Sequence, residues 1–344
     1  MRDTRRLVQL GQQEPCHARI ARKFDDFSRD GRHRVFAGDT SRDPLSAPRT
    51  HRMRARSGLG HGSGGTSFAP QMSFNEGKTP VDPKQVMVER DGAVMILTLN
   101  NPSSRNSLTS ELRDELGHAV REASTDRSVR SVLLAAAGPS FCAGGDFKML
   151  EVASDPWAVH RRFAGLKDWL FPLISLNKPM VVAVNGHAAG GGMGLSLCGD
   201  VVFASEDAKF MAAFFRLGAV PDIGMMYHLP RLIGLARAKT FLFGNQTWTA
   251  QEAFANGLVT RVCSSDKLKE EALGEARRLA DGPSEVMGLA KQLMARTFET
   301  GMHDMFAFEG LGQALAMSSS EFKEGLRAAV EKRPANFAAP TSQK

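Results

Sequence analysis

The sequence predicts an α/β fold in which strands and helices alternate to form a layered core. Two apolar runs, 131–137 and 180–184, have the length and composition of buried strands. Each run leads into a glycine-rich segment, and helical periodicity follows. After Gly257 the pattern is mostly helical. Because strands that alternate with helices favour a layered core, we expect an α/β domain followed by a helical C-terminal region.

The first expected elements are a hairpin and a helix. The hairpin comprises 86–90, a turn at Asp91-Gly92, and 93–99. The helix begins near Thr109 or Ser110, either of which can cap it. Its apolar stripe consists of Leu108, Leu112, Leu116, Ala119, Val120 and Ala123. Then we expect a strand at 131–137, helix near 157–174, a strand at 180–184, a helix from about 190, a strand at 200–204, and C-terminal helices at 266–281, 284–299, 302–317 and 319–331.

The composition of this 344-residue chain excludes several classes of protein. No apolar run approaches the roughly 20 residues that cross a bilayer, so we expect no membrane association. The four cysteines are far apart and form no C-x-x-C pair, which excludes a zinc ribbon and gives no disulfide framework. A reducing setting follows, and we expect a cytoplasmic location in preference to a mitochondrial one.

The positive charge is concentrated at the N-terminus. Residues 1–80 contain 15 Lys+Arg and 8 Asp+Glu, so the whole net charge of +7 lies there. This segment has no sustained hydrophobic period, and we expect it to be a disordered extension, with residues 1–71 dispensable. Nucleic-acid binding is not expected, although a nucleic-acid binder that uses the extension stays an alternative.

Two glycine-rich segments follow the two buried strands. The first, 138–148, reads GPSFCAGGDFK, and the second, 185–200, reads NGHAAGGGMGLSLCGD. Glycines at a strand-to-helix junction leave backbone N–H groups exposed at the positive end of a helix. Such groups can hold a phosphate, a carboxylate or a developing oxyanion. The chain lacks the G-x-x-x-x-G-K-[ST] and G-x-G-x-x-G patterns of nucleotide loops.

Together the two segments resemble the crotonase (enoyl-CoA hydratase/isomerase) superfamily, in which F-x-A-G-x-D is followed some 40 residues later by N-G-x-A-x-G-G-G. The resemblance covers roughly 82–337. It continues through Lys209-Phe210, Leu217-Gly218, 220–224, 229–234, 250–253, 257–259 and 331–334. It implies a spiral of β-β-α turns over 81–265, a helical trimerisation region over 266–338 and a short tail, 339–344. The expected assembly is a homotrimer or a dimer of trimers.

The resemblance also implies the site. The backbone N–H groups of Ala143 and Gly191 would form an oxyanion hole for the thioester oxygen of an acyl-CoA, because fixed donors stabilise charge that develops there. Small residues at Gly144 and Gly190 would let the acyl group approach, and Asp146 would brace the first loop. The acyl-CoA is the expected substrate, and neither a metal nor a redox cofactor is expected. A protein that binds acyl-CoA without catalysis is an alternative.

The carboxylates distinguish the possible reactions. Family hydratases have two glutamates that activate water, but Gly194 and Phe214 stand at those positions here, so we do not expect hydratase activity. Asp222 matches the single carboxylate of Δ3,Δ2-enoyl-CoA isomerases, and an apolar pocket would raise its pKa. The same position carries the nucleophile of 4-chlorobenzoyl-CoA dehalogenase-like enzymes. In that alternative, His160 would be the general base for hydrolysis.

Basic residues are the candidates for binding CoA. Arg105 matches a position where the family often has a basic residue near the nucleotide. Lys148 and Lys332 are similar candidates, and Lys332 would act from the C-terminal helical region. Phe214 is expected to contact the acyl group.

Overall fold

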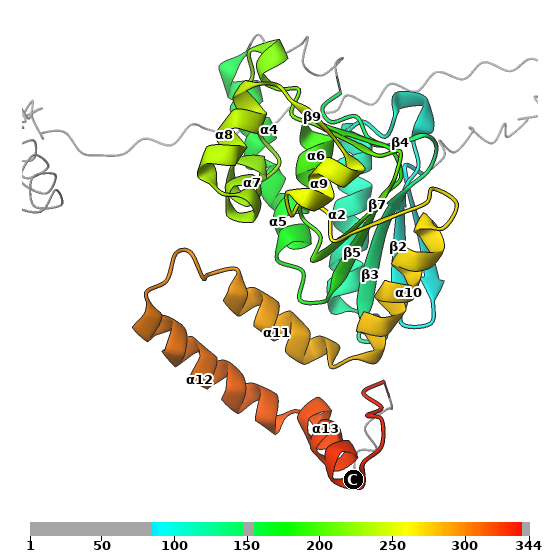
Figure 1. The fold of residues 1–344 in the computed structure, drawn as a ribbon, viewed down its shortest axis with the longest axis vertical. Helices are drawn as coiled ribbons and strands as arrows, with labels where there is room; N and C mark the ends of the chain where they lie inside the picture. Colours follow the sequence, from blue (N-terminus) through cyan, green and yellow to red (C-terminus); the bar gives the residue numbers. More distant parts are fainter. Residues whose placement is uncertain (1–83, 147–154, 339–344) are drawn as a thin grey trace, which may run out of the picture. The chain divides into compact units, whose positions relative to one another are not determined.

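The computed structural model describes residues 84–146 and 155–338. All of these residues fall within one compact unit of the chain, Glu76–Lys344. Figure 1 shows the alternation of strands and helices in this unit, which confirms the predicted α/β class. The predicted N-terminal extension, 1–80, and the predicted tail, 339–344, lie outside the described residues.

The larger sheet has six strands in the order β1-β2-β3-β5-β7-β10. The strands are β1 (Val86–Asp91), β2 (Val94–Leu99), β3 (Ser131–Ala136), β5 (Met180–Val184), β7 (Val201–Ser205) and β10 (Arg261–Cys263). β1 and β2 form the predicted antiparallel hairpin, and the other pairs are parallel. β5 is buried along its whole length, as expected of a strand covered on both faces.

Four short strands form a second sheet, which sequence periodicity did not reveal. They are β4 (Ser140–Cys142), β6 (His187–Ala189), β8 (Lys209–Met211) and β9 (Thr247–Thr249), in that order. β3, β5 and β7 each run into the next short strand, β4, β6 and β8, which are parallel to one another. Successive turns of the chain therefore add one strand to each sheet, as the expected β-β-α spiral requires.

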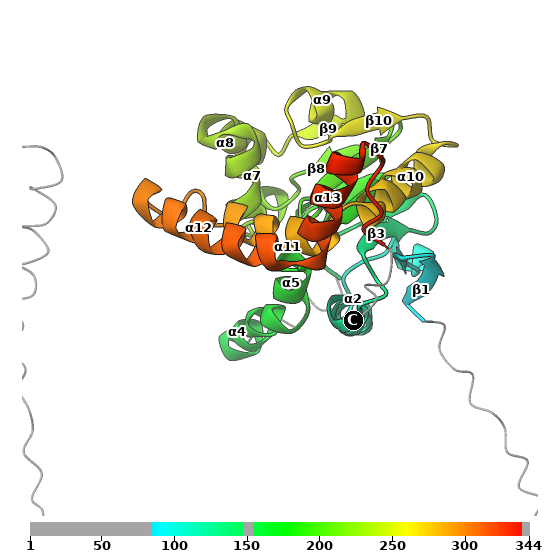
Figure 2. The same ribbon diagram turned by 90° about the horizontal axis from the view of Figure 1, so that it is seen from below.

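Helices cover both faces of the larger sheet (Figures 1 and 2). α2 (Ser110–Thr125) packs on one face and α10 (Leu268–Asp281) on the other. The remaining helices of this part are α4 (Pro156–Ala164), α5 (Leu166–Ile174), α6 (Gly191–Ser196), α7 (Met225–Ile233), α8 (Leu235–Phe243) and α9 (Ala250–Ala255). Alternate residues of the strands point to opposite faces, so Leu97 packs in the cluster that contains Leu112 of α2, whereas Ile96 packs with Ala272 of α10. Thr109 caps α2, because its side chain accepts a hydrogen bond from the Leu112 N–H.

The C-terminal region contains α11 (Ser284–Met294), α12 (Met302–Ser318) and α13 (Ser320–Glu331). The predicted helices are confirmed, although α11 ends five residues earlier than expected. Glu321 links α13 to the rest of the unit: it is almost fully buried, pairs with Arg130 at 3.1 Å and accepts a hydrogen bond from the Val286 N–H at 3.0 Å. Among the described residues, no helix is long and apolar enough to cross a membrane.

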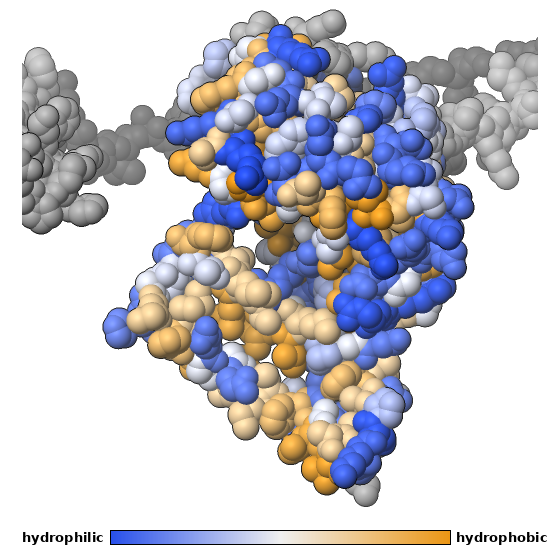
Figure 3. Space-filling model, viewed as in Figure 1, coloured by the Kyte–Doolittle hydropathy of each residue, from blue (hydrophilic) through white to orange (hydrophobic). Residues whose placement is uncertain are grey.

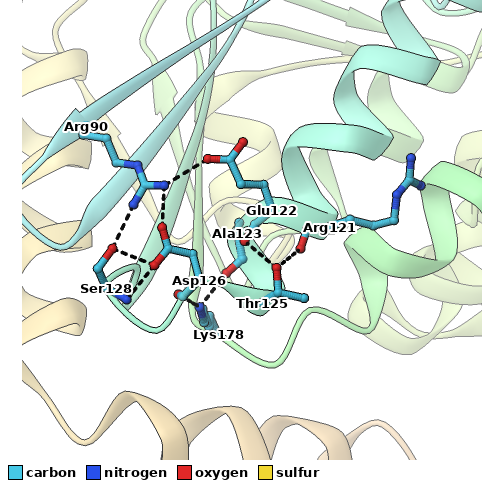
Figure 4. A network of polar contacts seen from close by, with 8 residues as sticks. All are labelled: Arg90, Arg121, Glu122, Ala123, Thr125, Asp126, Ser128 and Lys178. Carbon is cyan, nitrogen blue, oxygen red and sulfur yellow. Dashed lines mark hydrogen bonds and ion pairs between the residues drawn. The ribbon is translucent and has the colours of Figure 1, made fainter.

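A polar network fixes the C-terminal end of α2 (Figure 4). Arg90 of β1 donates to Asp126 at 2.7 Å and to Glu122 at 3.0 Å. The nearly buried Lys178, just before β5, donates to the backbone carbonyls of Ala123 and Asp126. A cation at these carbonyls also complements the negative end of the helix. The network therefore holds α2 in place, and the other end of the same helix reaches the candidate site.

Candidate active site

The two glycine-rich loops lie side by side because they follow neighbouring parallel strands. β4 leads into 143–146, and β6 leads into Gly190 and Gly191. The loops approach so closely that a Cβ atom on Gly144 would lie 2.6 Å from the Ala189 carbonyl oxygen and 3.0 Å from the Gly191 nitrogen. A Cβ on Gly192 would lie 2.1 Å from the Cys142 carbonyl oxygen. The absence of side chains at Gly144 and Gly192 therefore brings the two loops together.

The hydrogen bonds identify which N–H groups of these loops are unused. The Ala143 N–H donates to the Arg105 carbonyl at 2.9 Å, so the prediction of Ala143 as an oxyanion-hole donor is contradicted. The Gly190 N–H likewise donates to the Met211 carbonyl at 3.0 Å. In contrast, neither the Gly145 N–H nor the Gly191 N–H donates to any residue that the structure describes. Gly145 and Gly191 also both line the same cavity.

Asp222 reaches this cavity from the loop that precedes α7. Its Oδ1 would lie 3.6 Å from a Cβ built on Gly191. The next residue, Ile223, has φ of +50°, a conformation that a β-branched residue rarely adopts. Such strain persists only where surrounding contacts hold it in place, and it is common at functional sites. Here the buried Ile223 packs beside Gly191.

Burial raises the pKa of the Asp222 carboxyl above its usual range. Two smaller effects lower this pKa: the positive charge of Arg162 and the hydrogen bond from the N–H of Asp222 itself. A carboxylate whose pKa is raised is a stronger base than an ordinary aspartate. Asp222 is therefore suited to accept a proton from a carbon acid that occupies the cavity.

The cavity combines an apolar surface with four charged side chains. Its lining residues are Leu108, Arg113, Gly145, Asp146, Arg162, Phe163, Leu166, Gly191, Asp222 and Ile223. They come from α2 and the segment before it, the β4 loop, α4, α5, α6 and the loop before α7. No cluster of three or more His, Cys, Asp and Glu side chains that could hold a metal occurs in the described parts of the chain.

Neither of the two positions that carry glutamates in family hydratases supplies a carboxylate here. A Cβ on Gly194 would lie only 2.6 Å from the Ile223 carbonyl oxygen. The lack of a side chain there therefore allows the Asp222 loop to approach α6. Phe214 is buried, and its ring would lie 3.8 Å from a Cβ on Gly190. It packs in the core, and it is not among the described residues that line the cavity.

The candidate CoA ligands lie away from the cavity lining. Arg105 is exposed with φ of +55°, and it contributes the backbone carbonyl that accepts the Ala143 N–H. Lys332 is exposed at the end of α13. Lys148 lies outside the described residues. His160 is exposed and stacks edge to face on Trp157, whereas Asp146 lines the cavity as part of the first loop.

Asn106 is a structural residue of the site that the sequence did not reveal. It is fully buried, and its side-chain amide donates to the carbonyls of Ala137 and Ser140 at 2.9 Å each. Its side-chain oxygen accepts the Asn101 N–H at 2.8 Å. The first two bonds tie the segment before α2 to both ends of the turn that leads into β4, and the third bond closes that segment on itself. The only signal in the sequence is an Asn in a turn-like segment, which is typical of many turns.

The chain is similar in sequence and in fold to known proteins. The family model described as enoyl-CoA hydratase/isomerase matches residues 89–340. A 1,2-epoxyphenylacetyl-CoA isomerase of Escherichia coli is 37% identical over 250 residues, covering 71% of this chain and 94% of the relative. A probable enoyl-CoA hydratase of Rhizobium meliloti is 35% identical, covering 73% and 97%. The crystal structure of an enoyl-CoA hydratase/isomerase from Cupriavidus metallidurans has a TM-score of 0.70 at 31% identity, covering 76% and 98%. The chain therefore belongs to the enoyl-CoA hydratase/isomerase family of acyl-CoA enzymes, within the crotonase superfamily.

Proposed function

We propose that this enzyme is a Δ3,Δ2-enoyl-CoA isomerase with Asp222 as its acid and base. The observation that supports this most directly is one carboxylate of raised pKa beside two unused backbone N–H groups. Asp222 and Gly191 are neighbours, and Gly145 lines the same cavity. A proton shift along a carbon chain needs one base and a site for the negative charge that develops on the thioester oxygen.

The reaction follows from this arrangement. Asp222 takes a proton from C2 of a 3-enoyl-CoA, and the electrons of the C2–H bond pass into a dienolate with its charge on the thioester oxygen. The N–H groups of Gly145 and Gly191 bind that oxygen. Protonated Asp222 then returns the proton at C4, which leaves the double bond between C2 and C3. The reaction consumes no water and needs no electron carrier.

The same geometry disfavours hydration. Water addition by the family mechanism uses two carboxylates, and Gly194 and Phe214 supply none. Asp146 also lines the cavity, but it stands at neither of these two positions. It directly follows Gly145 on the loop that would bind the thioester oxygen.

The nucleophilic alternative, attack by Asp222 on an aryl- or acyl-CoA carbon, needs a base to hydrolyse the resulting ester. His160, which would have to be that base, is exposed, packs on Trp157 and is not among the described residues that line the cavity. We therefore favour proton transfer by Asp222 over nucleophilic attack.

A panel of CoA thioesters tests this function. The full-length protein is incubated with 3-enoyl-, 2-enoyl-, 2,4-dienoyl- and aryl-substituted acyl-CoA, and each product is followed by ultraviolet absorbance and mass. The aryl substrate is included because one similar enzyme is named a 1,2-epoxyphenylacetyl-CoA isomerase. We expect a 3-enoyl-CoA to gain conjugated absorbance without a change in mass. Rapid gain of one water by crotonyl-CoA would contradict the proposal.

We also propose that α11–α13 form the interface of a homotrimer or a dimer of trimers. Figure 3 shows apolar side chains gathered over α11 and α12. Phe306, Leu311 and Leu315 of α12 are exposed, and a groove between α11 and α12 is lined mostly by apolar residues. Exposed apolar surface of this kind is typical of interfaces. Light scattering of the full-length protein should give three or six times the mass of one chain, and a monomer would contradict this assignment.

A further inference from the structure

We propose that Arg162 is a positioning residue whose charge holds Asp222 as a carboxylate when an acyl group fills the cavity. This inference rests on the proposed role of Asp222 as a base. A base must be ionised before it can accept a proton, yet burial of a carboxylate favours its protonated form. A substrate that displaces water from the cavity increases that burial. The site therefore needs a nearby positive charge that does not itself occupy the carboxylate oxygens.

The structure of α4 directs Arg162 towards the cavity. The side chain of Asp155 caps the helix by accepting the N–H groups of Trp157 and Ala158. Arg161 pairs with the same Asp155 at 3.4 Å, and its side chain is 70% exposed. Arg162, one position later, lines the cavity together with Phe163 and Asp222. Two adjacent arginines on one helix thus have different surroundings, which provides a matched control.

Three charged side chains line the cavity with Asp222, and the titratable His228 lies on α7, which follows the Asp222 loop. Arg113 of α2 lines the cavity, but it also donates to the Thr109 carbonyl and the Ser110 hydroxyl. Asp146 is on the β4 loop, and Arg162 is on α4. His228 of α7 would lie 2.9 Å from a Cβ on Gly224, and burial followed by the charge of Arg231 lowers its pKa. Among the charged side chains in the described part of the chain, Arg162 is the one that lowers the pKa of Asp222.

Arg162 acts on Asp222 without an ion pair. None of the salt bridges among the described residues involves Arg162, and its guanidinium carbon lies 5.4 Å from the centre of the Phe163 ring. A direct ion pair would occupy the oxygens that must take the proton. A charge at longer range stabilises the carboxylate and leaves those oxygens free. Because charges interact more strongly in a medium of low dielectric constant, the effect of Arg162 grows when substrate excludes water.

The test compares Arg162→Met with Arg162→Lys and with the control Arg161→Met across a range of pH. For Arg162→Met, the acid limb of the kcat and kcat/KM profiles should move to higher pH. The ratio of wild-type to variant kcat should therefore be largest at low pH and approach one at high pH. Arg162→Lys should restore the wild-type profile, and Arg161→Met should not alter it. An equal loss at every pH would show that Arg162 has only a structural role, and it would overturn the proposal.

A second measurement does not depend on turnover. The ¹³C resonance of the Asp222 carboxyl, identified by its absence in Asp222→Asn, is titrated in wild type and in Arg162→Met. We expect it to titrate at higher pH in Arg162→Met. If it moves although no 3-enoyl-CoA is isomerised, the role of Arg162 stands and the proposed reaction fails. If it titrates at the same pH in both proteins, the inference about Arg162 is wrong.

Discussion

Asp222 and Asp126 lie near opposite ends of the region that α2 spans, and their surroundings shift the pKa of their carboxyl groups in opposite directions. Asp126 accepts hydrogen bonds from the Ser128 N–H at 2.8 Å, the Ser128 hydroxyl at 2.7 Å and Arg90 at 2.7 Å. These contacts, Ser128 first, lower its pKa to about 2. Asp222 makes no ion pair with a described residue, and burial raises its pKa. The first carboxylate is stabilised by its contacts, whereas the second keeps its capacity to bind a proton.

This difference separates a structural from a reactive aspartate. A carboxylate whose lone pairs are already occupied by donors is a weak base and serves to fix the chain. A carboxylate that is buried without such donors has a raised pKa and can transfer protons at neutral pH. The sequence contains both as ordinary aspartates, and only the fold distinguishes them. Variants of the two residues should therefore differ in activity and in stability.

The largest expected difference is in turnover. Asp222→Asn keeps nearly the same shape but removes the base, so kcat for a 3-enoyl-CoA should fall roughly a hundred- to ten-thousandfold. The oxyanion donors are untouched, so kcat should fall more than KM rises. Asp126→Asn should leave kcat close to the wild-type value. Steady-state kinetics of both variants makes this comparison, and full activity of Asp222→Asn would place the base elsewhere.

A smaller loss is expected at the position that supports Asp222. In Gly194→Ala the new Cβ would meet the Ile223 carbonyl oxygen at 2.6 Å, so the 222–223 backbone must shift. A displacement of about 1 Å in a catalytic group can cost roughly a hundredfold in rate. Gly274→Ala in α10 is the control, because nothing lies within 4 Å of its Cβ. Equal kcat values for the two alanine variants would show that the Asp222 loop does not depend on Gly194.

The smallest expected effect is on stability, and its sign differs between the two aspartates. The folded-state pKa of Asp222 is raised, so its contribution to stability is present below its unfolded pKa and is lost as pH rises through the folded pKa. Asp222→Asn should therefore raise Tm at pH 7, and the gain should vanish on acidification towards pH 4. The folded-state pKa of Asp126 is lowered to about 2, so Asp126 stabilises the protein above its unfolded pKa and loses that effect as pH falls towards 2.

Asp126→Asn should consequently lower Tm at pH 7, by an amount that decreases in acid. Thermal unfolding followed by circular dichroism between pH 3 and pH 8 measures both variants. A lowered Tm for both substitutions at pH 7 would show that the two carboxylates do not have opposite roles. The Arg90→Met variant extends the test, since it removes one hydrogen-bond donor to Asp126 and leaves the Asp126 side chain itself unchanged.

Much of this fold could be predicted because its elements have regular hydrophobic patterns. The hairpin at 86–99, the strands at 131–137 and 180–184 and the C-terminal helices all follow from periodicity. The second sheet could not be predicted in this way, because β4, β6, β8 and β9 are three residues long and show no period. These short strands nevertheless place the two glycine-rich loops together.

The site was predicted only in part for a related reason. The motif indicated the correct loop. The four small residues 142–145 do not indicate, however, which backbone N–H group lacks a hydrogen-bond acceptor. The hydrogen bond from Ala143 to Arg105 depends on a contact between segments 38 residues apart, and this contact leaves Gly145 beside Gly191. Arg113 and Arg162 were also missed as lining residues, because arginines on amphipathic helices usually face solvent.

Hydrogen exchange at the substrate carbon tests the central assignment most directly. The protein and an acyl-CoA are incubated in deuterated water, and mass spectrometry follows deuterium at C2 or C4. We predict rapid exchange with wild type and with Asp126→Asn, and no exchange above background with Asp222→Asn, although that variant still binds the thioester. Wild-type exchange by Asp222→Asn would contradict the account, because the proton would then pass through a group other than Asp222.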